Sequence, residues 1–418
     1  MTDRLSISDK IHKLAERATQ DCAPYFKPID EIAYRNSEKV LSAFQRHRVS
    51  DGCFYGTTGY GYNDKGRDTL DLVFADIMSA PSALVRAGFV NGTHAIAAAL
   101  YAALRPGMTL LSVTGLPYDT LRGVIGIAGD YRGSLKEYGV GYSQVELSSD
   151  GAVNLKAMAY AVRTKQVGAV FVQRSRGYSE RRALSVRDIG EICDIVHSID
   201  PGIVVLVDNC YGEFVEVTEP GGAGADLTAG SLIKNPGGGI APAGGYVAGR
   251  ADLVEAAAYR LTIPGIGAEC GASLGGNRLI YQGLFMAPHT VAQALKTAVF
   301  SARLFELLGY TASPRYSDTR YDIIQMVRLG SQELLERFCK GIQAGAPVDS
   351  YLTPEAWDMP GYDHKVIMAA GAFIQGASIE LSADGPLREP YNAYLQGGLT
   401  FESGKLGVML AASYLDKG

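Results

Sequence analysis

The chain has 418 residues, of which 47% are hydrophobic and 20% are charged. That length exceeds what one simple core needs, so we expect two domains, or one large domain with a smaller partner. Lys and Arg number 39 against 44 Asp and Glu, a net charge of -5, and no basic block occurs. This excludes the electrostatic footprint of a nucleic-acid-binding protein.

The N-terminus has mixed charge and no apolar core, so it predicts neither a signal peptide nor a transit peptide. No apolar run is long enough to span a bilayer, and we expect a cytoplasmic protein that does not associate with membranes. The six cysteines lack CxxC spacing, which favours reduced, mostly buried thiols. The six histidines form no cluster with carboxylates at ligand spacing, so no metal site is predicted.

Residues 1 to about 50 are predicted to be helical, and we expect residues 1–60 to form an arm that packs on a neighbour. Its apolar positions are Ile11, Leu14, Ala15, Ile32, Val40, Leu41 and Phe44. A loop of interleaved glycines and tyrosines follows, before a helix that starts near Asp68. Its glycines and tyrosines either form an ordinary turn or present the tyrosine hydroxyls and Arg67 to a ligand.

Strands and helices are predicted to alternate from about Ala87 to Val207. The segment "RAGFVNGTHAIAAALYAALRPGM" combines a strand-like run, the turn Asn91–His94 and an alanine-rich helix. Exposed amides at such a helix N-terminus bind phosphate, although Asn-Gly-Thr also caps helices that bind nothing. The next strand, Met108–Gly115, leads to Tyr118, whose ring either stacks on a planar ligand or covers the core.

Two further buried strands are predicted, over 167–173 and 203–207, with a helix between them that begins at a capping box of Ser185 and Asp188. The second strand ends on Asp208. Alternating strands and helices indicate a parallel sheet covered on both faces, with right-handed crossovers. Ligands bind such sheets at the carboxyl ends of the strands, where Asp208 would lie. Cys210 has no histidine near it in sequence, so we interpret it as a small apolar side chain.

A second short apolar stretch precedes Ser231 and Lys234, and glycines 237–239 follow. Pro288 is then expected to begin a long helix that ends at Gly309 and connects two domains. The predicted units are the arm at 1–60, a large domain at 61–287, and a connecting helix with a small α+β domain at 288–418. In the last unit we expect strands near 322–329 and 366–374, an amphipathic helix between them, and Arg388 in a proline-flanked loop.

These residues suit one cofactor chemistry. Burial depresses the pKa of a lysine amine, which can then attack an aldehyde, and pyridoxal 5'-phosphate is the commonest protein-bound aldehyde that needs one. Lys234 would provide the amine and Asp208 the carboxylate against the pyridine nitrogen. The phosphate would take donors from Gly92, Thr93 and Ser231, the ring would stack on Tyr118, and a substrate carboxylate would bind Arg388.

Each of these residues has a simpler interpretation when it is taken alone. Lys234 would be an ordinary surface lysine, Asp208 a helix cap and Arg388 a surface ion-pair partner. Their order and spacing along the chain favour the cofactor site.

The motifs "VDNCYGEFVE", "GADLTAGSLIKNPGGG" and "GGYVAG" resemble the γ-subfamily of fold-type-I pyridoxal-phosphate enzymes, the cystathionine and methionine lyases. With Asn91–Ile96 and "REPYNAYLQGGLTFE", the chain is most similar to the branch called aluminium-resistance proteins, methionine γ-lyase-like carbon–sulfur lyases. The similarity extends from about Phe54 to Leu410. It implies a large domain with a mostly parallel seven-stranded sheet covered by helices, and a smaller C-terminal α+β domain.

The resemblance also implies roles for residues. Lys234 would form the Schiff base and Asp208 would pair with the pyridine nitrogen. Gly92, Thr93 and Ser231 match the phosphate contacts, and Tyr118 matches the stacking tyrosine. The subfamily lends a Tyr-x-Arg from a neighbouring subunit to the phosphate; here Tyr60 and Tyr62 are present, but Arg67 lies further along. His94 replaces a small or thioether residue, so substrate choice is open.

The resulting hypothesis is a lyase that cleaves the C–S bond of a sulfur amino acid by β- or γ-elimination, with cystathionine, methionine and cysteine as candidate substrates. Lys234 would remove the α-proton, Tyr118 would assist proton transfer to the leaving group, and Arg388 would hold the carboxylate. The alternatives are another fold-type-I enzyme, such as an aminotransferase or aldolase, and a non-catalytic metal-stress protein that binds the cofactor. A homodimer or homotetramer with shared active sites is implied.

Overall fold

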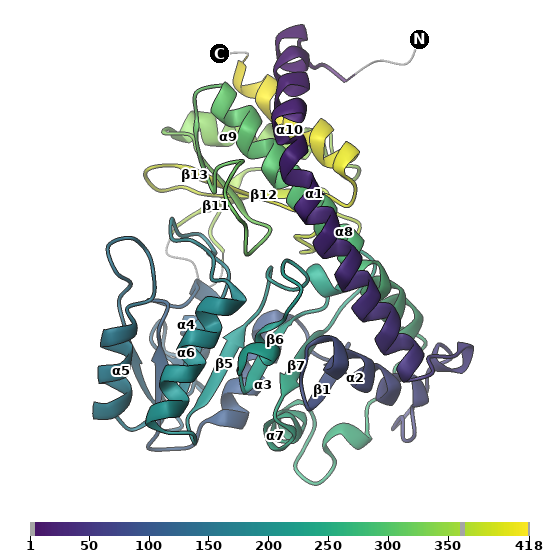
Figure 1. Cartoon of the computed structure of the whole chain (residues 1–418), viewed down its shortest axis with the longest axis vertical. Coiled ribbons are helices and arrows are strands. Elements are labelled where there is room, and N and C mark those ends of the chain that lie inside the picture. Colours follow the sequence, from purple (N-terminus) through teal and green to yellow (C-terminus); the bar gives the residue numbers. More distant parts are fainter. Residues whose placement is uncertain (1–4, 360–363, 417–418) are drawn as a thin grey trace.

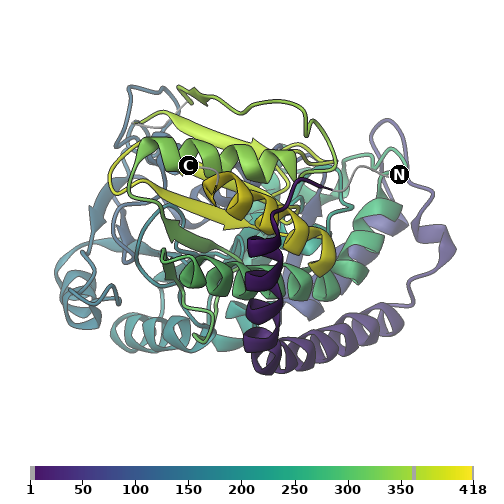
Figure 2. The ribbon, with the colours of Figure 1, turned by 90° about the horizontal axis from the view of Figure 1, so that it is seen from above.

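The computed structural model describes residues 5–359 and 364–416. A large domain lies at the bottom of Figure 1 and a small one at the top, and two long helices run alongside both. These helices are α1 (Asp9–Arg46) and α8 (Asn277–Leu307), which pack against each other. Figure 2, seen from above, shows the same two helices along one side of the molecule.

The large domain is built on a seven-stranded sheet with the order β1-β7-β6-β5-β4-β2-β3. Its strands are β1 (Ser82–Arg86), β2 (Thr109–Ser112), β3 (Gly141–Gln144), β4 (Val167–Gln173), β5 (Val204–Asp208), β6 (Leu227–Ser231) and β7 (Gly245–Gly249). Strand β7 pairs antiparallel with β1 and β6, and the other neighbours are parallel. The predicted mostly parallel sheet is therefore confirmed.

Helices cover this sheet, as the alternating pattern predicted. They are α2 (Lys65–Ile77), α3 (Gly92–Ala103), α4 (Asp119–Ile125), α5 (Leu155–Thr164), α6 (Val186–Ile199) and α7 (Ala251–Leu261). The predicted capping box is present at the start of α6, where Ser185 accepts from the Asp188 amide and the Asp188 carboxylate accepts from the Ser185 amide. Every residue of β5 is buried, which explains its unbroken apolar sequence.

The first strand lies before the run 86–90 in which we expected it. Strand β1 ends at Arg86, and the Phe89 amide donates to the Arg86 carbonyl in a turn. Phe89 is fully buried, but Val90 is 78% exposed. The adjacent apolar residues Phe89 and Val90 therefore suggested a strand in the sequence, although only Phe89 enters the core.

Pro288 lies inside helix α8 rather than at its start. The helix begins at Asn277, because Ile280, Tyr281 and Leu284 are buried in the core of the large domain. A proline removes one backbone donor from a helix, and here the packing of the preceding turns outweighs that loss. The connecting helix therefore starts within the segment that we assigned to the large domain.

The N-terminal helix packs on its own chain near both of its ends. Ile11, Ala15 and Ala18 enter the core of the small domain. Near its other end, the Asn36 amide donates to the carbonyls of Phe214 and Glu216, both at 3.1 Å. Helix α1 thus ties the two domains together.

The small domain has a six-stranded antiparallel sheet with the order β10-β11-β12-β13-β9-β8. Its elements are β8 (Thr311–Ser313), β9 (Gln325–Arg328), α9 (Gln332–Ala344), β10 (Ala356–Trp357), β11 (Val366–Ala370), β12 (Ser382–Pro386), β13 (Asn392–Gln396) and α10 (Phe401–Asp416). The predicted strands and amphipathic helix of this region are present. Within the described residues, none of the helices combines the length and apolar character needed to cross a bilayer.

Candidate active site

Asp208 lies at the carboxyl end of β5, beside Ala229 of β6. Its side chain is buried, and its Oδ1 accepts a hydrogen bond of 3.1 Å from the Cys210 amide. Burial raises the pKa of Asp208, while the positive charge of Lys234 opposes that shift. The carboxylate is therefore desolvated and faces a lysine. Cys210 is itself buried, as we interpreted it.

Lys234 follows β6 and leads into the short turn η3 (Asn235–Gly237). Its Nζ lies 3.9 Å from the centre of the Tyr211 ring. Burial lowers the pKa of Lys234, but the Tyr211 hydroxyl, the Cys210 thiol and the Asp208 carboxylate raise it, and the net direction is upward. The expected depression of this pKa is wrong, because the acceptors around the amine outweigh its desolvation.

The first turn of α3 lies against the end of β6. The Asn91 side chain caps the helix by accepting from the His94 amide at 2.8 Å. A Cβ at Gly92 would lie 3.1 Å from the Ser231 Cβ, which explains why a glycine permits this approach. The helix N-terminus and Ser231 therefore lie side by side, and their amides and hydroxyl are donors of the kind that bind an anion. We call Gly92, Thr93 and Ser231 the anion cradle.

Tyr118 precedes α4, and its hydroxyl donates to Thr93 Oγ1 at 3.2 Å. Burial and the nearby Asp208 carboxylate raise the pKa of Tyr118 well above its ordinary value. Tyr118 thus connects the anion cradle to Asp208. His94 points elsewhere, because its Nδ1 accepts from the Val90 amide and its ring packs edge-on against Phe89.

This arrangement fits pyridoxal phosphate, which needs four different contacts. The cradle at Gly92, Thr93 and Ser231 offers neutral donors for a phosphate. The aromatic ring of Tyr118 and the buried carboxylate of Asp208 suit the face and the nitrogen of a pyridine ring. Lys234 offers an amine beside them. The structure brings together, at one edge of the sheet, residues that lie far apart in sequence.

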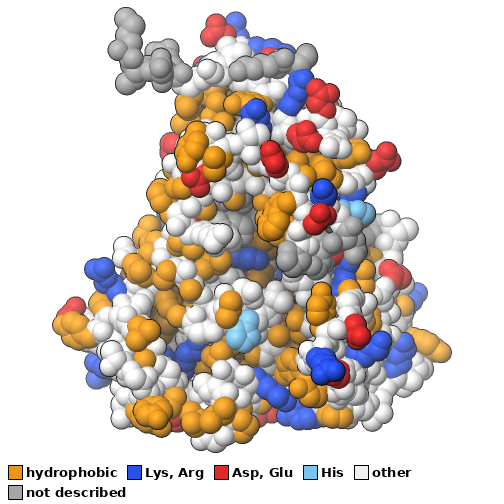
Figure 3. All heavy atoms as spheres, turned by 180° about the vertical axis from the view of Figure 1, so that it is seen from behind, with side chains coloured by type: hydrophobic (Ala, Val, Ile, Leu, Met, Phe, Trp, Pro, Cys, Tyr) orange, Lys and Arg blue, Asp and Glu red, His pale blue; other side chains and the backbone are white. Residues whose placement is uncertain are grey.

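The small domain faces this edge with a group of apolar and aromatic side chains. Ile324, Met326 and Tyr394 pack against Tyr178 and Tyr211 of the large domain. The rings of Tyr178 and Tyr394 lie 5.3 Å apart. Figure 3 shows a hollow between the two domains, with a basic side chain at its floor.

Sequence patterns did not single out these tyrosines, since no periodicity marks residues that meet across two domains. The one weak signal in the sequence was the position of Tyr211, which closely follows Asp208. In the structure its backbone has a positive φ of 71°. Such a backbone is uncommon for a tyrosine and often marks a functional turn.

Arg388 lies in the loop between β12 and β13, as predicted, and its side chain is exposed. Its Nη2 donates to the Tyr178 carbonyl at 2.9 Å. The guanidinium therefore lies beside the tyrosine group and on the small-domain side of the site.

Tyr60 and Tyr62 lie 76% and 55% exposed, with their rings stacked 5.8 Å apart. Arg67 is buried, and its Nη1 donates to the carbonyls of Gly61 and Gly271 at 2.7 and 3.0 Å. Arg67 thus holds its own loops together. Within the described part of this chain, none of the three is recorded in contact with Lys234.

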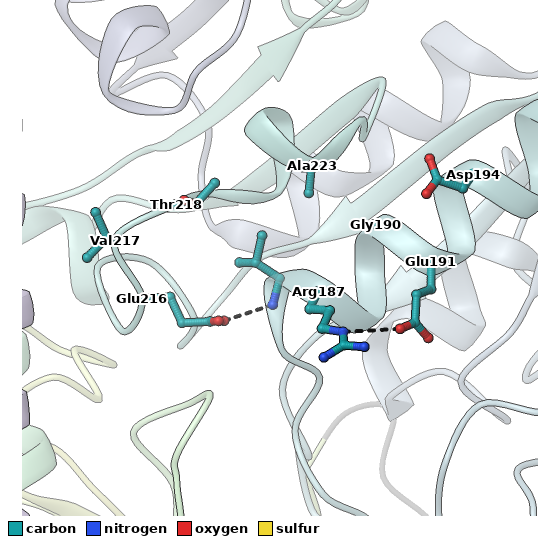
Figure 4. A pocket seen from close by; sticks show the side chains of 9 residues that line it. Arg187, Gly190, Glu191, Asp194, Glu216, Val217, Thr218 and Ala223 are labelled. Atoms are coloured by element: carbon teal, nitrogen blue, oxygen red, sulfur yellow. Dashed lines mark hydrogen bonds and ion pairs between the residues drawn. The ribbon is translucent and has the colours of Figure 1, made fainter.

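A separate pocket of about 540 Å³ lies between α6 and the segment 216–223 (Figure 4). Arg187 forms an ion pair with Glu191 there, and Glu216 accepts from the Val186 amide. None of its lining residues belongs to the group around Lys234. The polar side chains joined by dashed lines in Figure 4 already pair with each other or with the backbone.

Known proteins share this fold over its whole length. Uncharacterized protein YnbB of Bacillus subtilis (strain 168) is 49% identical over 418 residues, 99% of each chain. The crystal structure of a carbon-sulfur lyase involved in aluminum resistance from Clostridium novyi NT has a TM-score of 0.94 and 52% identity, over 97% of this chain and 96% of that one. A Clostridium acetobutylicum protein, provisionally named a cystathionine beta-lyase involved in aluminum resistance, has a TM-score of 0.95 and 50% identity, over 98% and 96%.

The pyridoxal-5'-phosphate dependent protein YhfS from Escherichia coli has a TM-score of 0.62 at 19% identity, over 92% of this chain and 96% of that one, and shares the fold alone. The large and small domains are thus those of fold-type-I enzymes. A profile of the methionine gamma-lyase family matches residues 11–415. The chain therefore belongs to the methionine gamma-lyase family, a family of pyridoxal-phosphate-dependent carbon–sulfur lyases.

Proposed function

We propose that this protein cleaves the C–S bond of a sulfur-containing amino acid by β- or γ-elimination, with pyridoxal phosphate as its cofactor. The observation that carries the proposal is the meeting of Asp208, Lys234 and the α3 N-terminus at one edge of the sheet. The names of the relatives at 52% and 50% identity, a carbon-sulfur lyase and a provisional cystathionine beta-lyase, support the same chemistry.

The cofactor would be held by the residues already described. Gly92, Thr93 and Ser231 would bind its phosphate through neutral donors, Tyr118 would cover its ring, and Asp208 would accept a hydrogen bond from its protonated ring nitrogen. When bound, pyridoxal phosphate supplies an electron-poor ring that stabilises negative charge on the α-carbon of an amino acid. A lysine amine beside the ring can take the α-proton in its neutral form, and we assign that step to Lys234.

The remaining steps need a proton donor and a carboxylate site. Burial and Asp208 raise the pKa of Tyr118, so its hydroxyl stays protonated at neutral pH and can donate to a departing sulfur. Arg388 is our candidate for the substrate carboxylate, because an arginine offers a planar pair of donors and this one borders the tyrosine group. Its exposed position leaves it free to turn from the Tyr178 carbonyl toward a substrate.

We further propose that the protein works as a homodimer or homotetramer with shared active sites. Tyr60 and Tyr62 support this, since two exposed, stacked phenols on a loop that Arg67 holds suit contact with a second copy. Arg67 would position that loop rather than touch the phosphate itself. We also propose that the protein works in the cytoplasm, and that its small-molecule substrate is an amino acid.

The test is product analysis with cysteine, cystathionine and methionine. Pyruvate or 2-oxobutyrate should appear together with ammonia, and Lys234→Ala should lose both this activity and the visible absorption of the bound cofactor. Lys405→Ala is the matched control, since Lys405 also lies over an aromatic ring, 5.5 Å from the centre of Phe300, but belongs to another part of the fold. Transfer of the amino group without ammonia would instead identify an aminotransferase, and cofactor binding without turnover a non-catalytic protein.

A further inference from the structure

The face of the small-domain sheet that looks toward Lys234 carries a carboxylate without a cationic partner. In β12, Ala383 packs under α9, so the next residue, Asp384, points to the opposite face. In β13, Tyr394 and Gln396 share that face for the same reason, because Ala393 and Leu395 enter the core. Register places Asp384 directly opposite Tyr394.

The partners of Asp384 are neutral. Gln396 Nε2 donates to its Oδ2 at 2.8 Å, and the Tyr178 hydroxyl bonds to the same carboxylate. Among the residues that the structure describes, no lysine, arginine or histidine forms an ion pair with it. Burial raises the pKa of Asp384, and the positive charge of Lys234 opposes that shift across the site. The carboxylate therefore lies within electrostatic range of the catalytic lysine.

Gln396 adds a second unfilled acceptor. This residue is only 1% exposed, and its Oε1 accepts no hydrogen bond from any described residue. A buried amide oxygen without a partner costs free energy, which a donor on a bound ligand would recover. Asp384 bonds to the Tyr178 hydroxyl and lies opposite Tyr394, and the rings of these two tyrosines are 5.3 Å apart. Aromatic rings near the carboxylate add to its attraction for a cation.

We propose that Asp384 and Gln396 form a subsite for an ammonium group at the far end of the substrate. The preferred substrates would then be thioethers that join two amino acids, with an ammonium on the half that departs as a thiol. A simple alkyl thioether has no donor for these acceptors and would be the poorer substrate. This inference rests on the proposed function and specifies the class of sulfur amino acid within it.

The test compares cystathionine with its analogue in which hydrogen replaces the distal ammonium. The holoenzyme should favour cystathionine in kcat/KM by roughly 10- to 100-fold, the range for a hydrogen-bonded charged group. Asp384→Asn should lower kcat/KM for cystathionine by a similar factor and change that for the analogue by less than about threefold. Glu180→Gln is the control, because Glu180 is a carboxylate on the same side of the site that is already paired with Arg328.

A binding measurement separates this inference from the proposed function. Titration calorimetry on Lys234→Ala, with and without Asp384→Asn, should show the same preference for cystathionine and the same loss. If the wild-type enzyme turns over no sulfur amino acid while this preference in binding persists, the proposed function fails and the subsite stands. Equal affinity for the two compounds, or an equal loss of both with Asp384→Asn, overturns the subsite. Urea unfolding of each variant identifies a loss of binding that comes from misfolding. If Asp384→Asn is misfolded, Gln396→Leu replaces it in the test, since this variant should also lose only the preference for the ammonium group.

Discussion

The Tyr246 hydroxyl donates a hydrogen bond of 2.8 Å to Glu213 Oε1, and both side chains are completely buried. The other oxygen, Glu213 Oε2, accepts no hydrogen bond from the described residues. A Cβ at Gly230 would lie 2.7 Å from Oε1, so a glycine in β6 makes room for this carboxyl. Burial raises the pKa of Glu213 to about 8.

We expect Glu213→Gln to stabilise the protein increasingly as pH rises. The folded-state pKa lies above that of the unfolded chain, so the folded state retains a proton that the unfolded state loses, and stability falls from about pH 4.5 to about pH 8. Glutamine keeps an acceptor for Tyr246 and does not ionise. The difference in unfolding free energy between variant and wild type should grow by roughly 4 kcal/mol between about pH 5 and pH 9.

Urea unfolding across this pH range, at constant cofactor concentration, measures the effect. Glu31→Gln, an exposed carboxylate on α1, should give a difference that stays nearly constant with pH. Parallel curves for Glu213→Gln and wild type would show that Glu213 ionises with an ordinary pKa.

Tyr118→Phe should separate ring stacking from proton donation. The variant keeps the ring but loses the hydrogen bond to Thr93, so cofactor affinity should fall by only about tenfold or less. Loss of a general acid should lower kcat by roughly 100-fold or more. Cofactor titration and initial rates measure the two effects.

The matched control is Tyr101→Phe. Tyr101 lies in α3, and its hydroxyl donates to the Gly133 carbonyl. An unchanged kcat in Tyr118→Phe would assign the proton transfer to another group.

Arg67→Ala should loosen two paired loops. The Gly271 amide donates to the Tyr60 carbonyl at 2.9 Å, and Arg67 donates to the carbonyls of Gly61 and Gly271 on both sides of this contact. Removal of a buried guanidinium leaves these carbonyls without partners, at a cost of about 2–4 kcal/mol. Urea unfolding and limited proteolysis of residues 54–64 should both detect the change.

Arg35→Ala is the control, because Arg35 is exposed and pairs with Glu31 on the same helix, an interaction of about 0.5 kcal/mol. Equal stability and equal cleavage for Arg67→Ala and wild type would contradict the role of Arg67 as the anchor of the loops.

Arg388→Ala should weaken substrate binding without loss of the cofactor. A charge-assisted pair with a substrate carboxylate contributes enough that KM should rise by roughly tenfold or more, while the visible absorption stays unchanged. Arg388→Lys should recover part of the loss, since a lysine keeps the charge but not the planar pair of donors. Arg187→Ala, in a separate surface pocket, should change neither quantity. A KM for Arg388→Ala equal to that of the wild type would remove Arg388 from the site.

The sequence by itself determined the features that depend on local pattern. Strand β5 was predictable because an apolar run ends abruptly at Asp208, and the start of α6 because Ser185 and Asp188 form a capping box. The order of acid, hydroxyl and lysine along two neighbouring strands was enough to indicate the cofactor. These signals work because strand burial and helix capping involve residues close together in the chain.

The tertiary structure alone decided how distant residues meet. It buried Arg67 between two loops, continued α8 through Pro288, and surrounded Lys234 with acceptors that reverse the expected direction of its pKa shift. It also set Asp384 of the small domain against the site in the large one. No local pattern records these relationships, because burial, charge and hydrogen bonding at such points depend on side chains brought together from both domains.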